Sequence, residues 1–87
     1  MSNNETRILG IMISKRLNDA THLQEVLTRY GCNIKTRLGL HNVEGSSCSP
    51  SGLVILELVG STEEMDNLEK EFQDKQGYTV QKMIFKL

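Results

Sequence analysis

The chain lacks several features that would place it in a specialised class of protein. It has no tryptophan, one proline and two cysteines among its 87 residues. No stretch approaches the roughly 20 consecutive apolar residues of a membrane span, so we expect no membrane insertion. The two cysteines, Cys32 and Cys48, do not make a disulfide framework, and the polar start of the chain has no signal-peptide pattern. These absences predict a cytoplasmic protein with free thiols.

An excess of one charge is missing as well. The chain has 10 Lys and Arg residues and 11 Asp and Glu residues, which gives a net charge of -1. This balance offers no electrostatic basis for non-specific binding to nucleic acid. A chain of this length forms one small domain that buries roughly 60–65% of its unfolded surface, so association with another copy would add stability.

A nearly continuous apolar run, Leu53–Val59, lies between two glycines in the second half of the chain. Such a run predicts a strand that is buried on both faces. Ser61 and Glu64 follow with the spacing of a capping box, in which each side chain bonds to the other residue's main-chain amide. We therefore expect a helix from Thr62 to about Lys75.

The other elements follow from the spacing of apolar residues. Both faces of Arg7–Ser14 are apolar, which predicts a second central strand. Asp19 is a candidate N-cap for a first helix that reaches Tyr30. Alternation predicts strands over 33–41 and 78–87. We expect residues 1–6 to be a disordered lead and residues 42–51 to be a polar loop.

The resulting order, β-α-β-β-α-β, is the ferredoxin-like pattern of the α+β class. It predicts a single domain over residues 7–87, with a four-stranded antiparallel sheet in the order 4-1-3-2 and both helices on one face. The first and third strands then lie in the centre of the sheet. This placement agrees with their being the two most apolar strands.

Two helices can cover only one face of such a sheet, so the other face is a candidate interaction surface. We expect its apolar centre and charged rim to join copies of the chain into a homodimer or homotetramer. Arg37 is expected opposite Glu57 across neighbouring strands as an opposite-charge pair. A few exposed aliphatic side chains without a partner are the simpler alternative. The predicted interface residues are Ile8, Met12, Arg37, Leu53, Ile55 and Glu57.

No catalytic constellation is visible, so we expect no enzymatic activity. His22 is interpreted as a solvated residue of the first helix. His41 and Cys48 flank the predicted loop, and imidazole plus thiolate suits a soft transition metal. Two ligands make no site, but a symmetric dimer would double them to four. The spacing matches no standard zinc pattern, so an ordinary loop cysteine and edge-strand histidine are the alternative.

Three segments, taken in order, resemble one known family. They are Arg7–Ile13, Leu23–Gly31 and Thr36–Leu40, and they are similar to segments of the small ACT-like proteins called iron-only hydrogenase system regulators. The resemblance covers nearly the whole chain. It implies an ACT-like ferredoxin fold that associates into dimers or larger assemblies and has a regulatory role.

The same resemblance implies a likeness to the effector half of the nickel-responsive repressor, which binds metal with His and Cys at a subunit interface. His41 and Cys48 are the nearest candidates here, and the repressor's multi-histidine pattern is absent. Only a few residues precede the first predicted strand, so we expect no counterpart of the repressor's DNA-binding segment and no direct DNA binding.

ACT domains that bind amino acids usually carry an Asp-Xaa-Pro-Gly-like turn between the first strand and the first helix. The turn in this chain has neither proline nor glycine, so backbone groups there form the candidate ligand site at a subunit interface. The residues of that site are Lys15, Arg16, Leu17, Asn18 and Asp19.

The prediction for the whole chain is a non-enzymatic, oligomeric regulatory domain, transcriptional or metabolic, that senses a small ligand at a subunit interface. Two alternatives stay open. One is a metal-responsive protein that uses His41 and Cys48 to hold a transition metal. The other is an adaptor that binds a protein through the uncovered sheet face or the edge strands.

Overall fold

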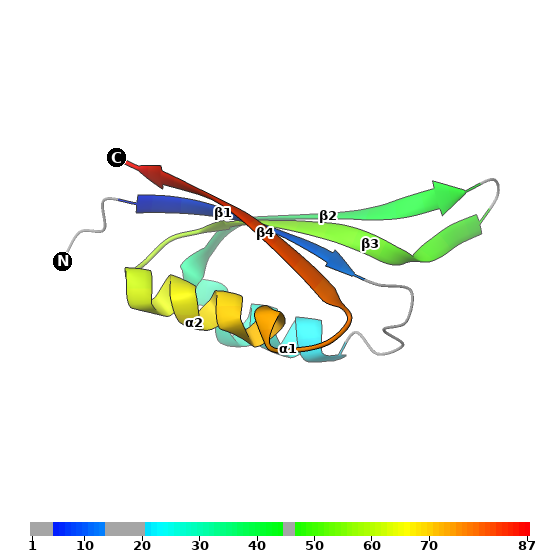
Figure 1. The fold of residues 1–87 in the computed structure, drawn as a ribbon, viewed down its shortest axis with the longest axis horizontal. Coiled ribbons are helices and arrows are strands. Elements are labelled where there is room, and N and C mark those ends of the chain that lie inside the picture. Colours follow the sequence, from blue (N-terminus) through cyan, green and yellow to red (C-terminus); the bar gives the residue numbers. More distant parts are fainter. Residues whose placement is uncertain (1–4, 14–20, 45–46) are drawn as a thin grey trace.

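The computed structural model describes residues 5–13, 21–44 and 47–87; within these ranges, residues 40–44 and 47–51 are described by their main chain alone. The elements are β1 (Glu5–Ile13), α1 (Thr21–Arg29), a 3-10 turn (Gly31–Asn33), β2 (Ile34–Glu44), β3 (Ser47–Leu58), α2 (Thr62–Gln73) and β4 (Tyr78–Lys86). All strand pairs are antiparallel, and the sheet has the order β2-β3-β1-β4. Both helices lie on one side of it (Figure 1). The predicted α+β ferredoxin-like fold is confirmed.

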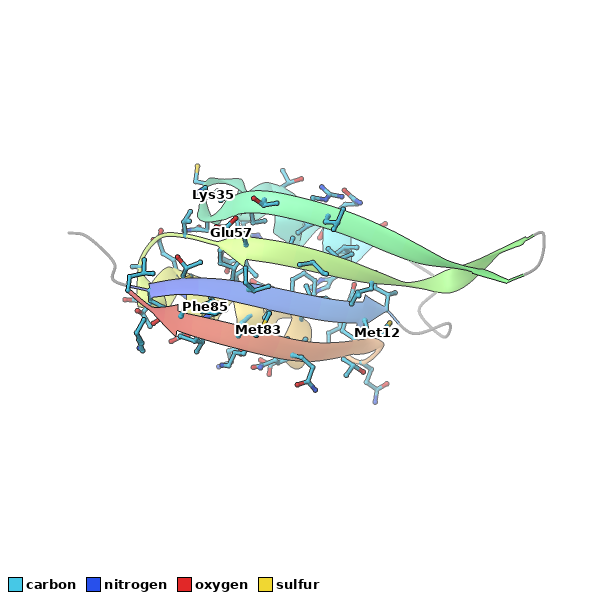
Figure 2. All side chains as sticks on the ribbon, turned by 90° about the horizontal axis from the view of Figure 1, so that it is seen from above. Met12, Lys35, Glu57, Met83 and Phe85 are labelled. Carbon is cyan, nitrogen blue, oxygen red and sulfur yellow. The ribbon has the colours of Figure 1, made fainter. Side chains whose placement is uncertain are left out.

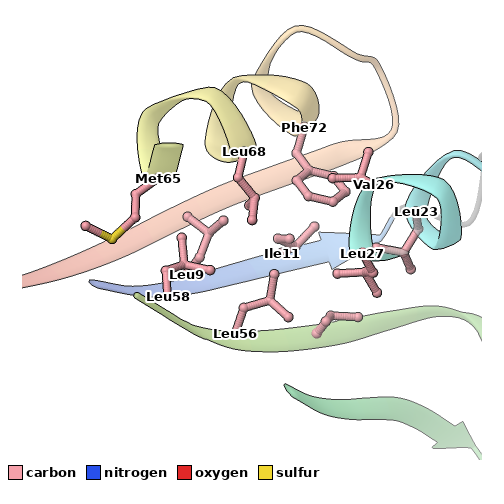
Figure 3. Packing of buried hydrophobic residues seen from close by; sticks show 11 residues of the cluster. Leu9, Ile11, Leu23, Val26, Leu27, Leu56, Leu58, Met65, Leu68 and Phe72 are labelled. Carbon is pink, nitrogen blue, oxygen red and sulfur yellow. The ribbon is translucent and has the colours of Figure 1, made fainter. Parts of the chain in front are cut away.

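The hydrophobic core lies between the helices and one face of the sheet. Leu9 and Ile11 alternate along β1 on that face, and both are fully buried. In the β1–β3 ladder Leu9 lies opposite Leu56 and Ile11 opposite Val54, so the two central strands present apolar residues to the helices together. The other core residues are Leu23, Val26, Leu27, Leu58, Met65, Leu68 and Phe72 (Figure 3). Truncating one of these buried side chains to alanine typically costs about 2–5 kcal/mol.

The start of α2 is fixed by the predicted capping box. The Ser61 hydroxyl accepts a hydrogen bond from the Glu64 main-chain N–H at 3.1 Å, and the Glu64 carboxylate accepts one from the Ser61 N–H at 3.0 Å. The second of these bonds holds the pKa of Glu64 below its usual value. Gly60 just before the cap has a φ of 110°, and a Cβ there would lie 2.5 Å from the Asn33 side chain. The turn from β3 into α2 therefore requires glycine at this position.

A cluster of charged side chains ties β1, α2 and β4 together on the helix side of the sheet. Arg7 is only 2% exposed, and its guanidinium donates to Glu5 at 2.8 Å, Glu69 at 2.9 Å and Asp66 at 2.8 Å. Burial opposes the charge of Arg7, but the hydrogen bonds to Asp66 and Glu5 outweigh it and raise its pKa. Because its partners surround it, the buried charge is compensated.

Two lysines of β4 complete this cluster. The Lys82 ammonium lies 2.9 Å from the Glu69 carboxylate, and the Lys86 ammonium lies 3.3 Å from the Glu5 carboxylate. With Arg7 and Asp66, the cluster contains three cationic and three anionic groups, so its formal charges cancel. The Lys82–Glu69 ion pair thus joins β4 to α2, alongside the ring contact of Tyr78 with Phe72 at 5.1 Å.

Two predicted segments differ from the structure. β1 begins at Glu5, so the predicted lead is two residues too long, because the Glu5 carboxylate joins the cluster around Arg7. The predicted loop over 42–51 is also wrong, since β2 extends to Glu44 and β3 begins at Ser47. An antiparallel ladder needs main-chain groups rather than apolar side chains, so a polar, serine-rich segment can continue it. This hairpin reaches beyond the helix layer (Figure 1).

The Glu5–Arg7 contact predicts a pH-dependent contribution to stability. The hydrogen bond from Arg7 lowers the pKa of Glu5 below the ordinary value of about 4.5. A lowered carboxyl pKa in the folded state stabilises the fold above the unfolded pKa, and this stabilisation is lost as the pH falls through the folded pKa. Glu5→Gln should therefore lower the midpoint of urea unfolding at pH 7, and the gap to wild type should narrow below about pH 4.

The matched control is Glu25→Gln, which removes the same charge from the exposed side of α1. This variant should unfold close to the wild-type midpoint at pH 7. An equal effect of the two substitutions at pH 7, or a Glu5→Gln gap that stays constant between pH 7 and pH 3, would contradict the assigned role of Glu5.

Candidate functional site

The face of the sheet turned away from the helices, here called the open face, is built by residues that alternate with the core. In the β1–β3 ladder Ile8 lies opposite Glu57 and Met12 opposite Leu53. Ile55 lies opposite Gly10, at the middle of the same ladder. Five of the six predicted interface residues therefore share this face: Ile8, Met12, Leu53, Ile55 and Glu57.

The edge strands enlarge the apolar area of the open face. On β4, Met83 lies opposite Ile8 and is 56% exposed, and Phe85 follows two residues later and is 50% exposed. On β2, Leu38 lies opposite Ile55 and is 50% exposed. Figure 2 shows the open face with Met12, Met83 and Phe85 along β1 and β4. The sequence interpretation missed Met83 and Phe85, although their alternation and the antiparallel order carried the signal, and it missed Leu38 because a register shift in β2 decides which face Leu38 takes.

A hollow lies at the centre of the open face. Its volume is about 320 Å³, and it is lined by Ile8, Gly10, Leu53, Ile55, Gln81, Lys82 and Met83. Gly10 contributes no side chain, yet an added Cβ would lie 3.8 Å from the Gln81 carbonyl oxygen, which is an ordinary contact distance. The packing of this chain therefore does not require glycine at position 10. The open face offers a shallow apolar hollow rather than a filled surface.

The prediction for Arg37 is wrong. The β2–β3 register shifts between Ile34 and Thr36, so that Ile34 lies opposite Leu58 but Thr36 lies opposite Glu57. The extra residue, Lys35, reverses the faces of the strand that follows it. Arg37 accordingly pairs with Leu56, on the opposite side from Glu57.

Other β2 residues contact the Glu57 carboxylate instead. The Thr36 hydroxyl donates a hydrogen bond to Glu57 at 2.8 Å, and the Lys35 ammonium lies 4.0 Å from the same carboxylate. Figure 2 shows Lys35 and Glu57 near one end of the open face. The predicted charged rim exists at this end, with Lys35 as its cation rather than Arg37.

Two predicted sites lie outside what the structure describes. The candidate ligand residues Lys15, Arg16, Leu17, Asn18 and Asp19 fall in the segment 14–20 between β1 and α1. For the metal candidates, the main chain pairs His41 with Gly52 and Cys48 with Val43, but their side chains are outside the description. Among the described side chains, no group of three or more His, Cys, Asp or Glu residues could hold a metal ion. Metal binding therefore stays a prediction.

His22 is not the solvated helix residue that its position predicted. It is half-buried, and its ring lies 5.9 Å from the ring of Phe72 and 5.8 Å from that of Tyr78. Its Nε2 lies 3.0 Å from the main-chain oxygen of Glu71, so an N–H at that position donates to α2. The imidazole thus links the first turn of α1 to the last turns of α2.

A polar cleft of about 470 Å³ runs between α1 and α2 beside His22. At one side of it, the Glu71 carboxylate accepts hydrogen bonds from Arg29 at 2.8 Å and from the Tyr30 hydroxyl at 3.2 Å. Burial raises the pKa of Tyr30, and the bond to Glu71 raises it further. The contacts of His22, Arg29 and Tyr30 with Glu71 thus join the two helices beside the cleft.

Neither described helix is long and apolar enough to cross a membrane. No protein-family model matches the sequence, and no curated protein matches it either.

Solved structures share the fold. An uncharacterised protein from Thermotoga maritima superposes with a TM-score of 0.79 at 19% identity, over 94% of this chain and 99% of the other. CPII, a nitrogen regulatory PII-like protein from Thiomonas intermedia K12 that was solved with ADP, AMP and bicarbonate, gives 0.62 at 16% identity over 95% and 90%. A protein from Thermus thermophilus described as PII-like gives 0.54 at 17% identity over 100% and 91%. At these identities the likeness shows the fold alone, and the resemblance to hydrogenase system regulators stays a prediction.

Proposed function

We propose that the chain is a non-enzymatic regulatory domain, transcriptional or metabolic, that senses a small ligand and acts as a homo-oligomer joined through the open face. The observation that carries this proposal is the contiguous apolar surface on the face away from the helices, with Met12, Leu38, Met83 and Phe85 each 44–56% exposed. Large exposed apolar patches with a polar rim mark interaction sites.

The size of the open face fits a subunit interface. Four strands about 4.8 Å apart, over about eight residues at roughly 3.3 Å each, make a flat area of about 500 Å². Side-chain relief adds to this area, which brings it towards the ~800 Å² that each partner of a stable complex buries. The hollow at Gly10 gives a second copy a place for an apolar side chain such as Met83.

The ligand-sensing part of the proposal rests on the fold and on charge. A PII-like neighbour with the same fold was solved with ADP, AMP and bicarbonate, so adenine nucleotides are the first ligands to test. The segment between β1 and α1 supplies Lys15 and Arg16, and such side chains bind phosphate through charge-assisted hydrogen bonds. We propose that this segment binds the ligand beside a second subunit.

A charge placed at the centre of the proposed interface should strongly weaken self-association of the chain. Ile55→Asp would place a carboxylate opposite Gly10, beside the hollow, and its desolvation should weaken self-association at least tenfold. Sedimentation equilibrium of the full chain measures this effect. Thr28→Asp adds the same charge to the exposed side of α1 and should leave association unchanged.

Urea unfolding of Ile55→Asp should confirm that the variant is folded. A monomeric wild type at concentrations up to about 1 mM, or an Ile55→Asp variant that associates like wild type, would contradict the assigned interface.

If the proposed ligand site is correct, nucleotide binding should depend on Lys15 and Arg16. Isothermal titration calorimetry with ADP and AMP should show saturable binding. Lys15→Ala and Arg16→Ala should each weaken it about tenfold, the ~1.4 kcal/mol expected for losing one charge-assisted contact. Lys70→Ala, which removes an exposed lysine of α2, is the matched control and should bind as wild type does.

If ADP, AMP and the common amino acids all give no binding heat at millimolar concentration, the sensing role is wrong. The interface test is separate, so self-association could be shown even where ligand sensing fails.

A further inference from the structure

The outer edge of β4 is a second surface with chemistry of its own. β4 is the last strand of the sheet, so in the described part of the chain no strand pairs with its side away from β1. Its ladder with β1 runs without a register shift from Tyr78 to Lys86. A long, regular strand with an unpaired edge is a template for pairing with another strand.

Two of the usual protections of an edge strand, proline and a β-bulge, are missing from β4. It contains no proline, and its two lysines turn inward to the charged cluster, where Lys82 lies 2.9 Å from Glu69 and Lys86 lies 3.3 Å from Glu5. Inward-pointing charged residues on an edge strand normally discourage its pairing with another strand. Here their charges are compensated within the subunit, so they guard the edge only weakly.

The opposite edge of the sheet is protected in a way that β4 is not. The β2–β3 register shifts twice, between Ile34 and Thr36 and again between His41 and Val43. Lys35 lies in the first of these irregularities, and such bulges twist an edge away from partners. Of the two edges, β4 is the one that is suited to strand pairing.

The exposed apolar side chains on and next to β4 also favour pairing with a second strand. Met83 and Phe85 are about half exposed on the open face, and Ile84 is 41% exposed on the helix side. Leu87, directly after the strand, is 82% exposed. Apolar residues on both faces of an exposed strand gain from a neighbour that covers both faces at once.

We propose that β4 pairs antiparallel with β4 of a second copy of the chain, centred on Met83, around a two-fold axis perpendicular to the sheet. In this register Lys82 lies opposite Ile84 of the partner subunit, and Lys86 lies opposite Val80 of the partner subunit. A register centred on Ile84 would instead place Lys82 opposite the partner's Lys86, and one centred on Lys82 would place two copies of Lys82 together. Like charges directly opposite destabilise a strand pair, so charge disfavours these two registers, whereas the register centred on Met83 places two exposed apolar side chains opposite each other.

A second copy is a better occupant than an unrelated extended peptide because the strand complements itself. Pairing through Met83 continues the sheet to eight strands with all helices on one side. It also places the Met83 side chains of both subunits next to each other on the open face and extends its apolar area across the seam. This interface is separate from stacking through the open face, and either can exist without the other.

Site-directed disulfide cross-linking tests the register. In a full-length Cys32→Ser, Cys48→Ser background, Met83→Cys places two thiols directly opposite each other, with Cα atoms about 4.5–5.5 Å apart, which suits a disulfide. Mild oxidation with diamide should convert most of this variant into a covalent dimer. The same register separates the two copies of Phe85→Cys by roughly 13 Å and those of Thr79→Cys by roughly 26 Å, so neither should cross-link.

Ile55→Cys serves as the control for the open face, since it lies two strands away from the seam. It should cross-link only if subunits stack through that face. Covalent dimer from Met83→Cys no greater than from Thr79→Cys would overturn the proposal. Efficient cross-linking of both Met83→Cys and Ile55→Cys, with loss of the Met83→Cys cross-link when Ile55→Asp is added to that variant, would also overturn it, because the open face alone would then explain the result.

Charge at Ile84 gives an independent check that needs no thiol. In the proposed register Ile84→Lys faces the partner's Lys82 and should weaken the β4 contact at least tenfold, whereas Ile84→Glu faces the same lysine and should retain it. Sedimentation equilibrium of the two variants measures the difference. Equal association of both variants would overturn the register.

Discussion

The fold depends on a mismatch between two strands and two helices. β1 and β3 lie in the centre of the sheet and carry apolar residues on both of their faces, while the two helices cover only one face. The covered face forms a dry core of leucine, isoleucine, methionine and phenylalanine. The same alternation that buries Leu9 and Leu56 leaves Ile8 and Ile55 on the other side. The open face is thus a direct consequence of how the core is made.

The structure resolves this mismatch differently at its two edges. On β2, the extra residue Lys35 moves Leu38 onto the open face and turns Arg37 away from it. On β4, Met83 and Phe85 extend the apolar area, while Lys82 and Lys86 hold the helix side to buried carboxylates. One edge is irregular, and the other is regular, with its two lysines paired to carboxylates of the same chain. This asymmetry supports assigning the two edges different roles in assembly.

Much of the fold could be predicted from sequence because its signals are local. Apolar periodicity identified the two helices and all four strands, and the Ser61–Glu64 spacing identified the start of α2. Alternation alone grouped Leu9 and Ile11 on one face of β1, and Leu56 and Leu58 on one face of β3, and the structure shows that these are the buried faces. The order of the strands followed from the element pattern, because a ferredoxin-like arrangement places the two most apolar strands at the centre.

The sequence predictions failed where a contact between residues far apart in the sequence determines the local structure. A single inserted residue in β2 changed the face of Arg37, and a bulge of this kind has no distinct composition. The contact of Glu69 with Arg7 was not predicted, although the place of Glu69 between Leu68 and Phe72 on the buried stripe could have indicated a buried partner. The surroundings of His22 were not predicted for the same reason, because its partners Phe72 and Tyr78 lie far away in sequence, on α2 and β4.

The most direct test of the open-face interface is a measurement of contacts between subunits. An isotope-filtered NOE experiment on a mixture of labelled and unlabelled chains detects protons of one copy that lie close to another. Association through the open face predicts intermolecular NOEs to the methyl groups of Ile8, Leu38, Ile55 and Met83. Intermolecular NOEs confined to the helix side, or none at concentrations where the chain is oligomeric, would contradict it.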